Sequence, residues 1–181
     1  MVSSARATET SSNSEFTWCM CHEALQPPNK KSMDMGKNKF IEDVRKDIAD
    51  YGCSVVSIDD EEPPFAYTVG LWPRFKHPEL IMFGLPGGVM ANILNAIAAK
   101  IAAGAEFKES SHLADVGGKF GVHVKPLHEA YLSRYFGFGL QFHEQVFPIA
   151  QVVWPDREGR FPEEPGYDDS YSDMQPVLTG L

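Results

Sequence analysis

Cysteine is scarce in this sequence, with three residues in 181. Cys19 and Cys21 lie one residue apart and Cys53 stands alone, and an odd number of cysteines argues against a disulfide framework. The sequence has no apolar run near the ~20 residues that a membrane helix needs. Its first residues lack the apolar core of a secretory signal. We therefore expect a cytoplasmic protein that does not enter a membrane.

Basic residues are outnumbered by acidic ones. The chain has 16 Lys and Arg against 25 Asp and Glu, which gives a net charge of −9. Proteins that bind a phosphate backbone need clustered Lys and Arg, so we do not expect nucleic acid as a partner. The acids gather in Asp59–Glu62 and between residues 155 and 173. These runs are interpreted as solvated loops or, alternatively, as a docking surface for a basic partner.

Familiar catalytic and nucleotide-binding motifs are also missing. The sequence has no Gly-x-Ser-x-Gly nucleophile motif and no internal repeat. Gly87 and Gly88 precede a predicted helix, but the lysine and longer glycine pattern of a phosphate-binding loop are absent. The motifs therefore identify no reaction and no cofactor.

Polarity divides the chain into two parts. Residues 1–37 are rich in Ser, Thr, Asn, Lys and Pro and predict a flexible tail, interrupted by one apolar island from Phe16 to Leu25. Residues 38–178 predict one domain, because their apolar residues follow helix and strand periods. The island is expected either to anchor on that domain or to remain loose.

The predicted domain mixes helices with short strands. An amphipathic helix is expected to start at Asn38 as its N-cap and to end at Gly52. The other predicted elements are strands at 53–58, 65–72 and 80–83, a helix at 89–103, a hairpin within 107–127, a short helix at 128–138 and a strand at 147–154. The fold class is therefore α+β, with a mostly antiparallel sheet of about five to six strands, two main helices and a short third one.

Three residues between two predicted strands are candidates for catalysis. Tyr67 lies on the strand at 65–72, and His77-Pro78-Glu79 follows it. A histidine, a carboxylate and a phenol within reach of one another could form a general acid/base set. The alternative is structural: His77 lies in an exposed connection, and Glu79 caps a backbone group or pairs with a lysine such as Lys76.

Cys19, Cys21 and His22 are the candidate metal ligands. Three soft ligands within four residues could bind zinc or copper(I), with a fourth ligand from His112 or His143. Structural zinc sites generally use wider cysteine spacing. Coincidental cysteines in a tail are the alternative interpretation.

Four further residues are candidates for ligand binding: His123, Gln151, Trp154 and Asp156. Gln151 lies in an otherwise apolar strand and must find hydrogen-bond partners if it is buried. A structural bond to a neighbouring loop would satisfy it equally well. His123 also lies among apolar residues, where a histidine often serves only the core.

Four blocks of the sequence, in order, resemble a bacterial family of unknown function, DUF4262. The blocks are Ala66–Leu71, His77–Leu80 with Phe83–Leu85, Gln151–Asp156 with Gly159, and Gln175–Leu178. They span roughly residues 38–178. Members of that family often have a Cys-x-x-Cys block, from which Cys19-x-Cys21 departs. The resemblance implies a fold and a bacterial source, and it implies no reaction.

Two functions are therefore expected. The first is a non-catalytic binding or interaction module, with acidic loops and exposed aromatic residues at Trp154, Tyr167 and Tyr171 as its surface. The second is a small enzyme or small-ligand binder that uses a cleft containing Tyr67, His77 and Glu79, with His123 as an optional further member. The expected partner is a protein or a small molecule.

Overall fold

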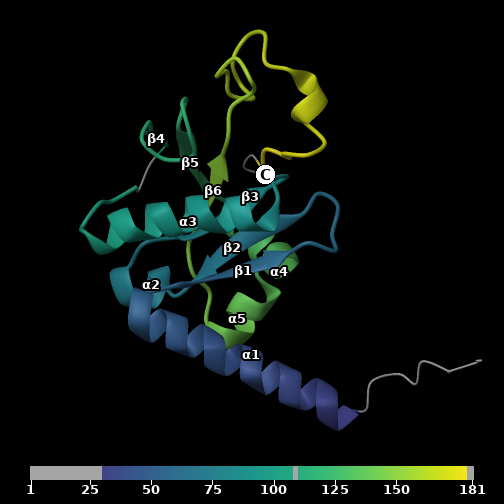
Figure 1. The fold of residues 1–181 in the computed structure, drawn as a ribbon. Coiled ribbons are helices and arrows are strands. Elements are labelled where there is room, and N and C mark those ends of the chain that lie inside the picture. The colour runs from purple at the N-terminus through teal and green to yellow at the C-terminus, as the bar shows by residue number, and fades with distance from the viewer. Residues whose placement is uncertain (1–29, 108–109, 179–181) are drawn as a thin grey trace, which may run out of the picture.

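A six-stranded sheet is the centre of the structure, a computed structural model that describes residues 30–107 and 110–178 (Figure 1). The helices are α1 (Lys30–Tyr51), α2 (Leu71–Phe75), α3 (Gly87–Ala102), α4 (Leu132–Tyr135) and α5 (Gly137–His143), with short 3-10 helices η1 (Glu129–Tyr131) and η2 (Asp169–Tyr171). The strands are β1 (Ser54–Ile58), β2 (Phe65–Val69), β3 (Glu79–Phe83), β4 (Ser111–Leu113), β5 (Val122–Leu127) and β6 (Ile149–Val153).

The strand order is β1-β2-β3-β6-β5-β4, so β1 and β4 are the edges. Only the β3–β6 pair is parallel, and the other four pairs are antiparallel. The short connections from β1 to β2 and from β2 to β3 cannot hold a crossover helix, which explains their antiparallel pairing. The predicted α+β class and its mostly antiparallel sheet are confirmed.

Each face of the sheet has its own core. On one face α3 lies across the strands, and Leu94 and Ile97 are completely buried there (Figure 1). On the other face α1, α4 and α5 cover Tyr67 and other aromatic residues. In the part of the chain that the structure describes, no helix is both long and apolar enough to cross a membrane.

Helix α1 is longer than the sequence indicates. It begins at Lys30, so the prediction that Asn38 is its N-cap is wrong. Val44 is buried against the sheet, whereas Phe40 and Tyr51, which the helical period places with it, are 42% and 75% exposed. Gly52 ends the helix with a positive φ of 94° and donates its N–H to Ile48 O, as expected for a C-terminal glycine.

Two local predictions differ from the structure. The strand predicted at 65–72 ends at Val69, and Gly70 with φ 120° turns the chain into the short helix α2. The single helix predicted at 128–138 is instead η1, α4 and α5 in succession, with a break at Phe136. Both differences occur where glycines interrupt an apolar pattern, and period alone does not reveal such a turn.

The chain after β6 returns to the sheet as a C-terminal strap, which we define as residues 174–178. The strap crosses Gly84, whose φ is 81°. A Cβ at Gly84 would overlap the carbonyl group of Met174. Gly84 is therefore required both by its backbone conformation and by the close approach of the strap.

Candidate functional site

Glu79 occupies a completely buried position where β2 and β3 separate. Its Oε2 accepts a hydrogen bond from Thr68 Oγ1 at 2.7 Å, and its Oε1 accepts from the backbone N–H groups of Gly70 at 2.8 Å and Trp72 at 3.1 Å. Thr68 Oγ1 in turn accepts from Leu80 N at 2.8 Å. Glu79 thus caps the first turn of α2 and joins it to β3, which is a structural task.

His143, in the last turn of α5, is an ionisable neighbour of Glu79. Its Nε2 lies 3.5 Å from Glu79 Oε1, and the side chain is 4% exposed. Nε2 is buried without a hydrogen-bond partner. This buried imidazole–carboxylate pair forms across the sheet face, and nothing in the local sequence around residue 143 indicates it.

Tyr67 belongs to the aromatic core on the same face. Its ring packs against Phe136 with a centroid distance of 4.9 Å. Burial raises the pKa of Tyr67 to about 12, although hydrogen bonds with the backbone of Phe138 and Gly139 oppose the shift. A phenol with this pKa is protonated at neutral pH, and its oxygen is already engaged by the first turn of α5.

His77 is 4% exposed and lies before β3, in the loop that follows α2. Its Nδ1 is 2.9 Å from Pro78 O, and its Nε2 is 3.3 Å from Phe107 N. This arrangement fits a neutral imidazole that donates through Nδ1 and accepts at Nε2. Burial lowers its pKa, with a hydrogen bond to Pro78 and the charge of Glu79 opposing the shift. Both ring nitrogens are occupied by the backbone.

The three candidate catalytic residues are close along the chain but do not line one common cleft. His77 borders a hollow of about 240 Å³ between α2 and the end of α3, and neither Tyr67 nor Glu79 lines it. Since general acid/base chemistry needs groups that reach the same bound molecule, this geometry favours structural roles. The acid/base set stays a prediction.

Gln151 lies on β6, and its side chain is almost completely buried. Its Nε2 donates to Pro176 O at 2.8 Å, and its Oε1 accepts from Leu178 N at 2.9 Å. Both ends of the amide therefore hold the C-terminal strap. The structural alternative for Gln151, a bond to a neighbouring segment, is the one that the geometry matches.

Gln175 makes the reciprocal connection from the strap to β6. Its Oε1 accepts from Trp154 N at 2.7 Å, and its Nε2 donates to Trp154 O at 2.8 Å. The Trp154 indole donates to Phe83 O at 2.8 Å. Two glutamines and one tryptophan thus fasten the strap to β6 and β3.

Asp156 organises the loop that follows β6. Its Oδ1 accepts from the backbone N–H groups of Glu158 and Arg160, and its Oδ2 accepts from Asp168 N and from Arg160 Nε at 3.0 Å. Burial alone raises the pKa of Asp156, but these hydrogen bonds outweigh it and leave the pKa below its usual value. Asp156 is thus fully engaged within the loop.

His123 stacks on Phe161, with ring centroids 3.5 Å apart and planes 6° apart. The His112 ring lies edge-on to His123 at 5.0 Å. Burial lowers the pKa of His123, and the charges of His112 and Lys125 lower it further. His123 is therefore part of an aromatic stack, separate from His77.

The expected surface of exposed aromatic residues does not form. Trp154 and Tyr167 are each only 9% exposed, and Tyr171 packs edge-on against Trp154. The nearby charges are also partly paired: Lys125 lies 2.6 Å from Glu163. The prediction that Trp154 and Tyr167 are exposed is wrong, because the strap and the loop pack around them. The acidic docking surface stays a prediction.

The candidate metal ligands Cys19, Cys21 and His22 lie outside the described residues, so metal binding by this block stays a prediction. Within residues 30–107 and 110–178, no group of three or more His, Cys, Asp or Glu side chains is arranged to hold a metal ion. His112 and His143, the suggested fourth ligands, lie on β4 and α5 respectively.

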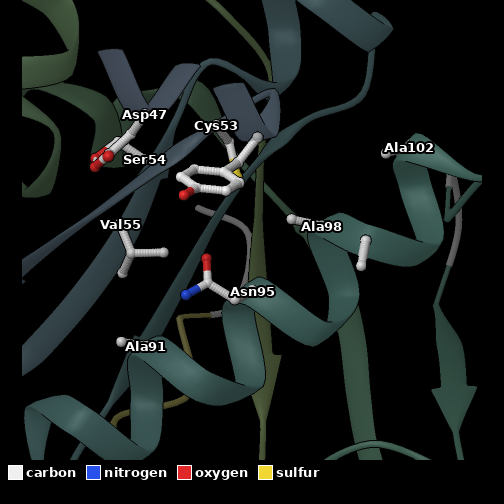
Figure 2. A pocket seen from close by; sticks show the side chains of 10 residues that line it. Asp47, Cys53, Ser54, Val55, Ala91, Asn95, Ala98 and Ala102 are labelled. Atoms are coloured by element: carbon white, nitrogen blue, oxygen red, sulfur yellow. Dashed lines mark hydrogen bonds between the residues drawn. The ribbon is translucent and has the colours of Figure 1, made fainter. Parts of the chain in front are cut away.

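The largest opening that we describe lies elsewhere, between α1, β1 and α3 (Figure 2). This α1–β1–α3 groove has a volume of about 670 Å³. It is lined by Asp47, Tyr51, Cys53, Ser54, Val55, Ala91, Asn95, Ala98, Ala99 and Ala102. Figure 2 shows the small alanines along one wall, with the amide of Asn95 pointing into the opening. Sequence reasoning missed this site because its residues come from three separate elements and form no motif.

The groove contains one thiol and one carboxylate. Burial raises the pKa of Cys53 to about 12, and the charges of Glu79 and Asp47 add to the shift. Since the thiolate is the reactive form of cysteine, Cys53 is a poor nucleophile. Asp47 accepts a hydrogen bond from Ser54 at 2.9 Å. Asn95 directs its side-chain amide into the groove (Figure 2).

These observations define a class: a single-sheet α+β domain with internally bonded polar clusters and an open groove at a sheet edge. Residues 47–168 match the family described as "Domain of unknown function (DUF4262)", and this chain belongs to that family. The resemblance found in the sequence is thereby confirmed. No curated protein and no solved structure matches the chain significantly.

Proposed function

We propose that this chain is a non-catalytic binding module. Its site is the α1–β1–α3 groove, and its ligand is an extended, mainly apolar segment of a protein partner. The observation that supports this most is the combination of small side chains on α3 with the outer edge of β1, which has no strand partner among the described residues. An added strand gains main-chain hydrogen bonds along such an edge and places alternate side chains in the groove.

The state of the polar residues also favours binding over catalysis. The side-chain oxygens of Glu79 and Asp156 and the amide of Gln151 all bond to neighbouring parts of the same chain. Groups held in this way contribute to stability and are not free to meet a substrate. The Cys53 thiol in the groove has a raised pKa, which keeps it in its protonated and less reactive form.

A small enzyme that uses Tyr67, His77 and Glu79 is the second candidate. One observation favours it: His143 Nε2 lies without a hydrogen-bond partner beside the Glu79 carboxylate. Buried imidazole–carboxylate pairs are common in general acid/base sites. The pair has no described hollow next to it, so it ranks below the groove.

The experiment compares two matched substitutions on α3. Ala99→Phe fills the groove, whereas Ala96→Phe adds the same ring at an exposed position of α3 outside the groove lining. The tagged full-length protein is used to capture partners from a lysate of its source organism. We expect wild type and Ala96→Phe to retain one stoichiometric partner, and Ala99→Phe to retain at least about tenfold less, equivalent to 1.4 kcal/mol.

Two results would contradict the binding function. One is the absence of any stoichiometric partner, and the other is equal capture by the Ala99→Phe variant. Circular dichroism of both variants provides the control for folding, since both positions are exposed and neither ring has to enter the core.

A further inference from the structure

Acidic residues flank the outer edge of β1 at both of its ends. The stretch from Asp47 to Glu62, which runs from α1 through β1 into the following turn, contains six acidic residues and no basic one. Strand β1 itself contains no charge, and among the described residues it pairs with β2 alone. The groove therefore combines an uncharged strand edge with negative charge at either end.

Asp47 provides the charge at the first end of β1. It lines the groove, is only partly buried and accepts a hydrogen bond from Ser54 Oγ at 2.9 Å (Figure 2). Asp50, about one turn further along α1, is exposed. Among the ten described residues that line the groove, Asp47 is the only charged one. No basic side chain of the lining therefore compensates for this carboxylate.

Asp59 provides the charge at the other end of β1. Its Oδ1 accepts a hydrogen bond from Ser57 Oγ at 3.1 Å. The carboxylate also lies against the first residue of α3, since a Cβ at Gly87 would fall 2.6 Å from Asp59 Oδ1. A carboxylate is favoured at the N-terminal end of a helix, which helps to hold it there. Asp47 and Asp59 thus lie near opposite ends of β1, whose five residues span ~13 Å.

We propose that the ligand of the groove is an extended segment of a protein partner with a Lys or Arg at each end of an uncharged stretch as long as β1. This inference rests on the proposed binding function and specifies its ligand. The uncharged stretch pairs with the outer edge of β1 and places alternate side chains against the alanines of α3. The two cations then lie beside Asp47 and Asp59.

Charge of this kind selects among partners more than it strengthens binding. An exposed ion pair changes an affinity by about one- to fivefold, and salt weakens the effect. A segment with acidic ends is repelled at both ends of β1, so the same carboxylates exclude it. Main-chain hydrogen bonds and apolar contacts with α3 supply the remaining affinity.

A second copy of the chain is the rival occupant, and charge disfavours it. Because both ends of β1 are acidic, parallel and antiparallel pairing of two β1 strands would alike place carboxylates of one copy beside those of the other. We therefore expect the full-length protein to sediment as a monomer. A dimer that dissociates in the Ala99→Phe variant would identify the second copy as the occupant and overturn the proposal.

The test measures the binding of three fluorescein-labelled peptides to the full-length protein by fluorescence anisotropy. The peptides share the core Val-Ser-Val-Ser-Val and carry Lys, Gln or Glu at both ends. At low ionic strength we expect the Lys peptide to bind about five- to tenfold more tightly than the Gln peptide, and the Glu peptide to bind most weakly. In about 0.5 M salt the difference between the Lys and Gln peptides should fall below about twofold, because the charges are screened.

Two matched substitutions locate the charge that the Lys peptide meets. Asp47→Asn removes one carboxylate but keeps an oxygen that can accept the hydrogen bond from Ser54. We expect it to weaken binding of the Lys peptide about two- to fivefold and to leave the Gln peptide unchanged. Glu129→Gln removes the same charge at an exposed position of η1 outside the groove lining, and both affinities should stay unchanged.

The possible outcomes separate this ligand from the binding function itself. If all three peptides bind equally and Ala99→Phe blocks them, the groove binds extended segments and the charge selection is wrong. If the Lys peptide is preferred but Ala99→Phe has no effect, the acids attract it outside the groove, and the proposed ligand is again wrong. If no peptide binds, the proposed ligand fails, whereas capture of a partner from lysate still decides the binding function.

Discussion

The junction of β2, β3 and β6 and the α1–β1–α3 groove differ in how they use polar side chains. At the junction, Glu79, Gln151 and Gln175 lie almost fully buried and bond to the backbone of neighbouring segments. In the groove, alanines form one wall, and the outer edge of β1 has no strand partner within residues 30–107 and 110–178. The polar side chains of the junction are buried and hydrogen-bonded, whereas the groove is open and has small apolar side chains along one wall.

This difference shows what the distinctive residues of the sequence do. A buried amide or carboxylate stabilises a fold only when each of its atoms has a partner, which restricts the residue types that fit. The motif-like blocks are therefore explained by the packing of α2 and the C-terminal strap. A surface that binds an apolar segment needs only a suitable shape and small side chains. Such residues form no recognisable sequence motif.

Removing the carboxylate of Glu79 is expected to have the largest effect on stability, because the junction depends on it. Glu79→Ala leaves the N–H groups of Gly70 and Trp72 and the hydroxyl of Thr68 without their acceptor in a buried site. We expect a loss of about 3–5 kcal/mol in the free energy of unfolding, measured by urea denaturation.

Glu79→Gln keeps one acceptor oxygen and should lose less than the alanine variant. The exposed Glu42→Ala on α1 is the control and should change stability by less than about 0.5 kcal/mol. A Glu79→Ala protein as stable as wild type would show that the carboxylate has no capping role, and it would favour the catalytic alternative.

Loosening the C-terminal strap is expected to have a smaller effect. Gln175→Ala removes both hydrogen bonds to the backbone of Trp154, and the backbone just after β6 then loses its partner. We expect a loss of about 1–3 kcal/mol and faster amide exchange at Trp154. Gln145→Ala, at an exposed position, is the control, and equal stability of the two variants would contradict the strap as a stabilising element.

Periodicity predicted most of the fold because it reports which side chains are buried. The strands β1, β3 and β6 and the helix α3 were predictable from β-branched runs and an apolar stripe. Helix α2 was not predictable, because its first turn depends on a hydrogen bond from Trp72 N to Glu79, a residue that follows the helix. The start of α1 at Lys30 was missed because no apolar period marks it.

The sequence singled out residues of the junction but not the groove, and it did not indicate how the polar atoms of the junction are bonded. The sequence indicated that Glu79 and Gln151 are unusual, and the parallel pairing of β3 with β6 does bring their strands together. It did not indicate that their polar atoms are bonded internally, because the partners are backbone groups of α2 and the strap. His143 is 64 residues from Glu79, and only the tertiary structure reveals this pair.

The loop after β6 and the groove should differ slightly in how much each contributes to the loss of stability at low pH. The folded-state pKa of Asp156 lies below its usual value of 3.8, so its hydrogen bonds stabilise the fold above that pH. This stability is lost as the pH falls through the lower folded-state value. We expect Asp156→Asn to flatten the decrease in urea midpoint between pH 5 and pH 2.5, whereas Ala99→Phe should retain the full decrease. Parallel curves for wild type and Asp156→Asn would show that another carboxyl group, such as Asp168, dominates the acid response.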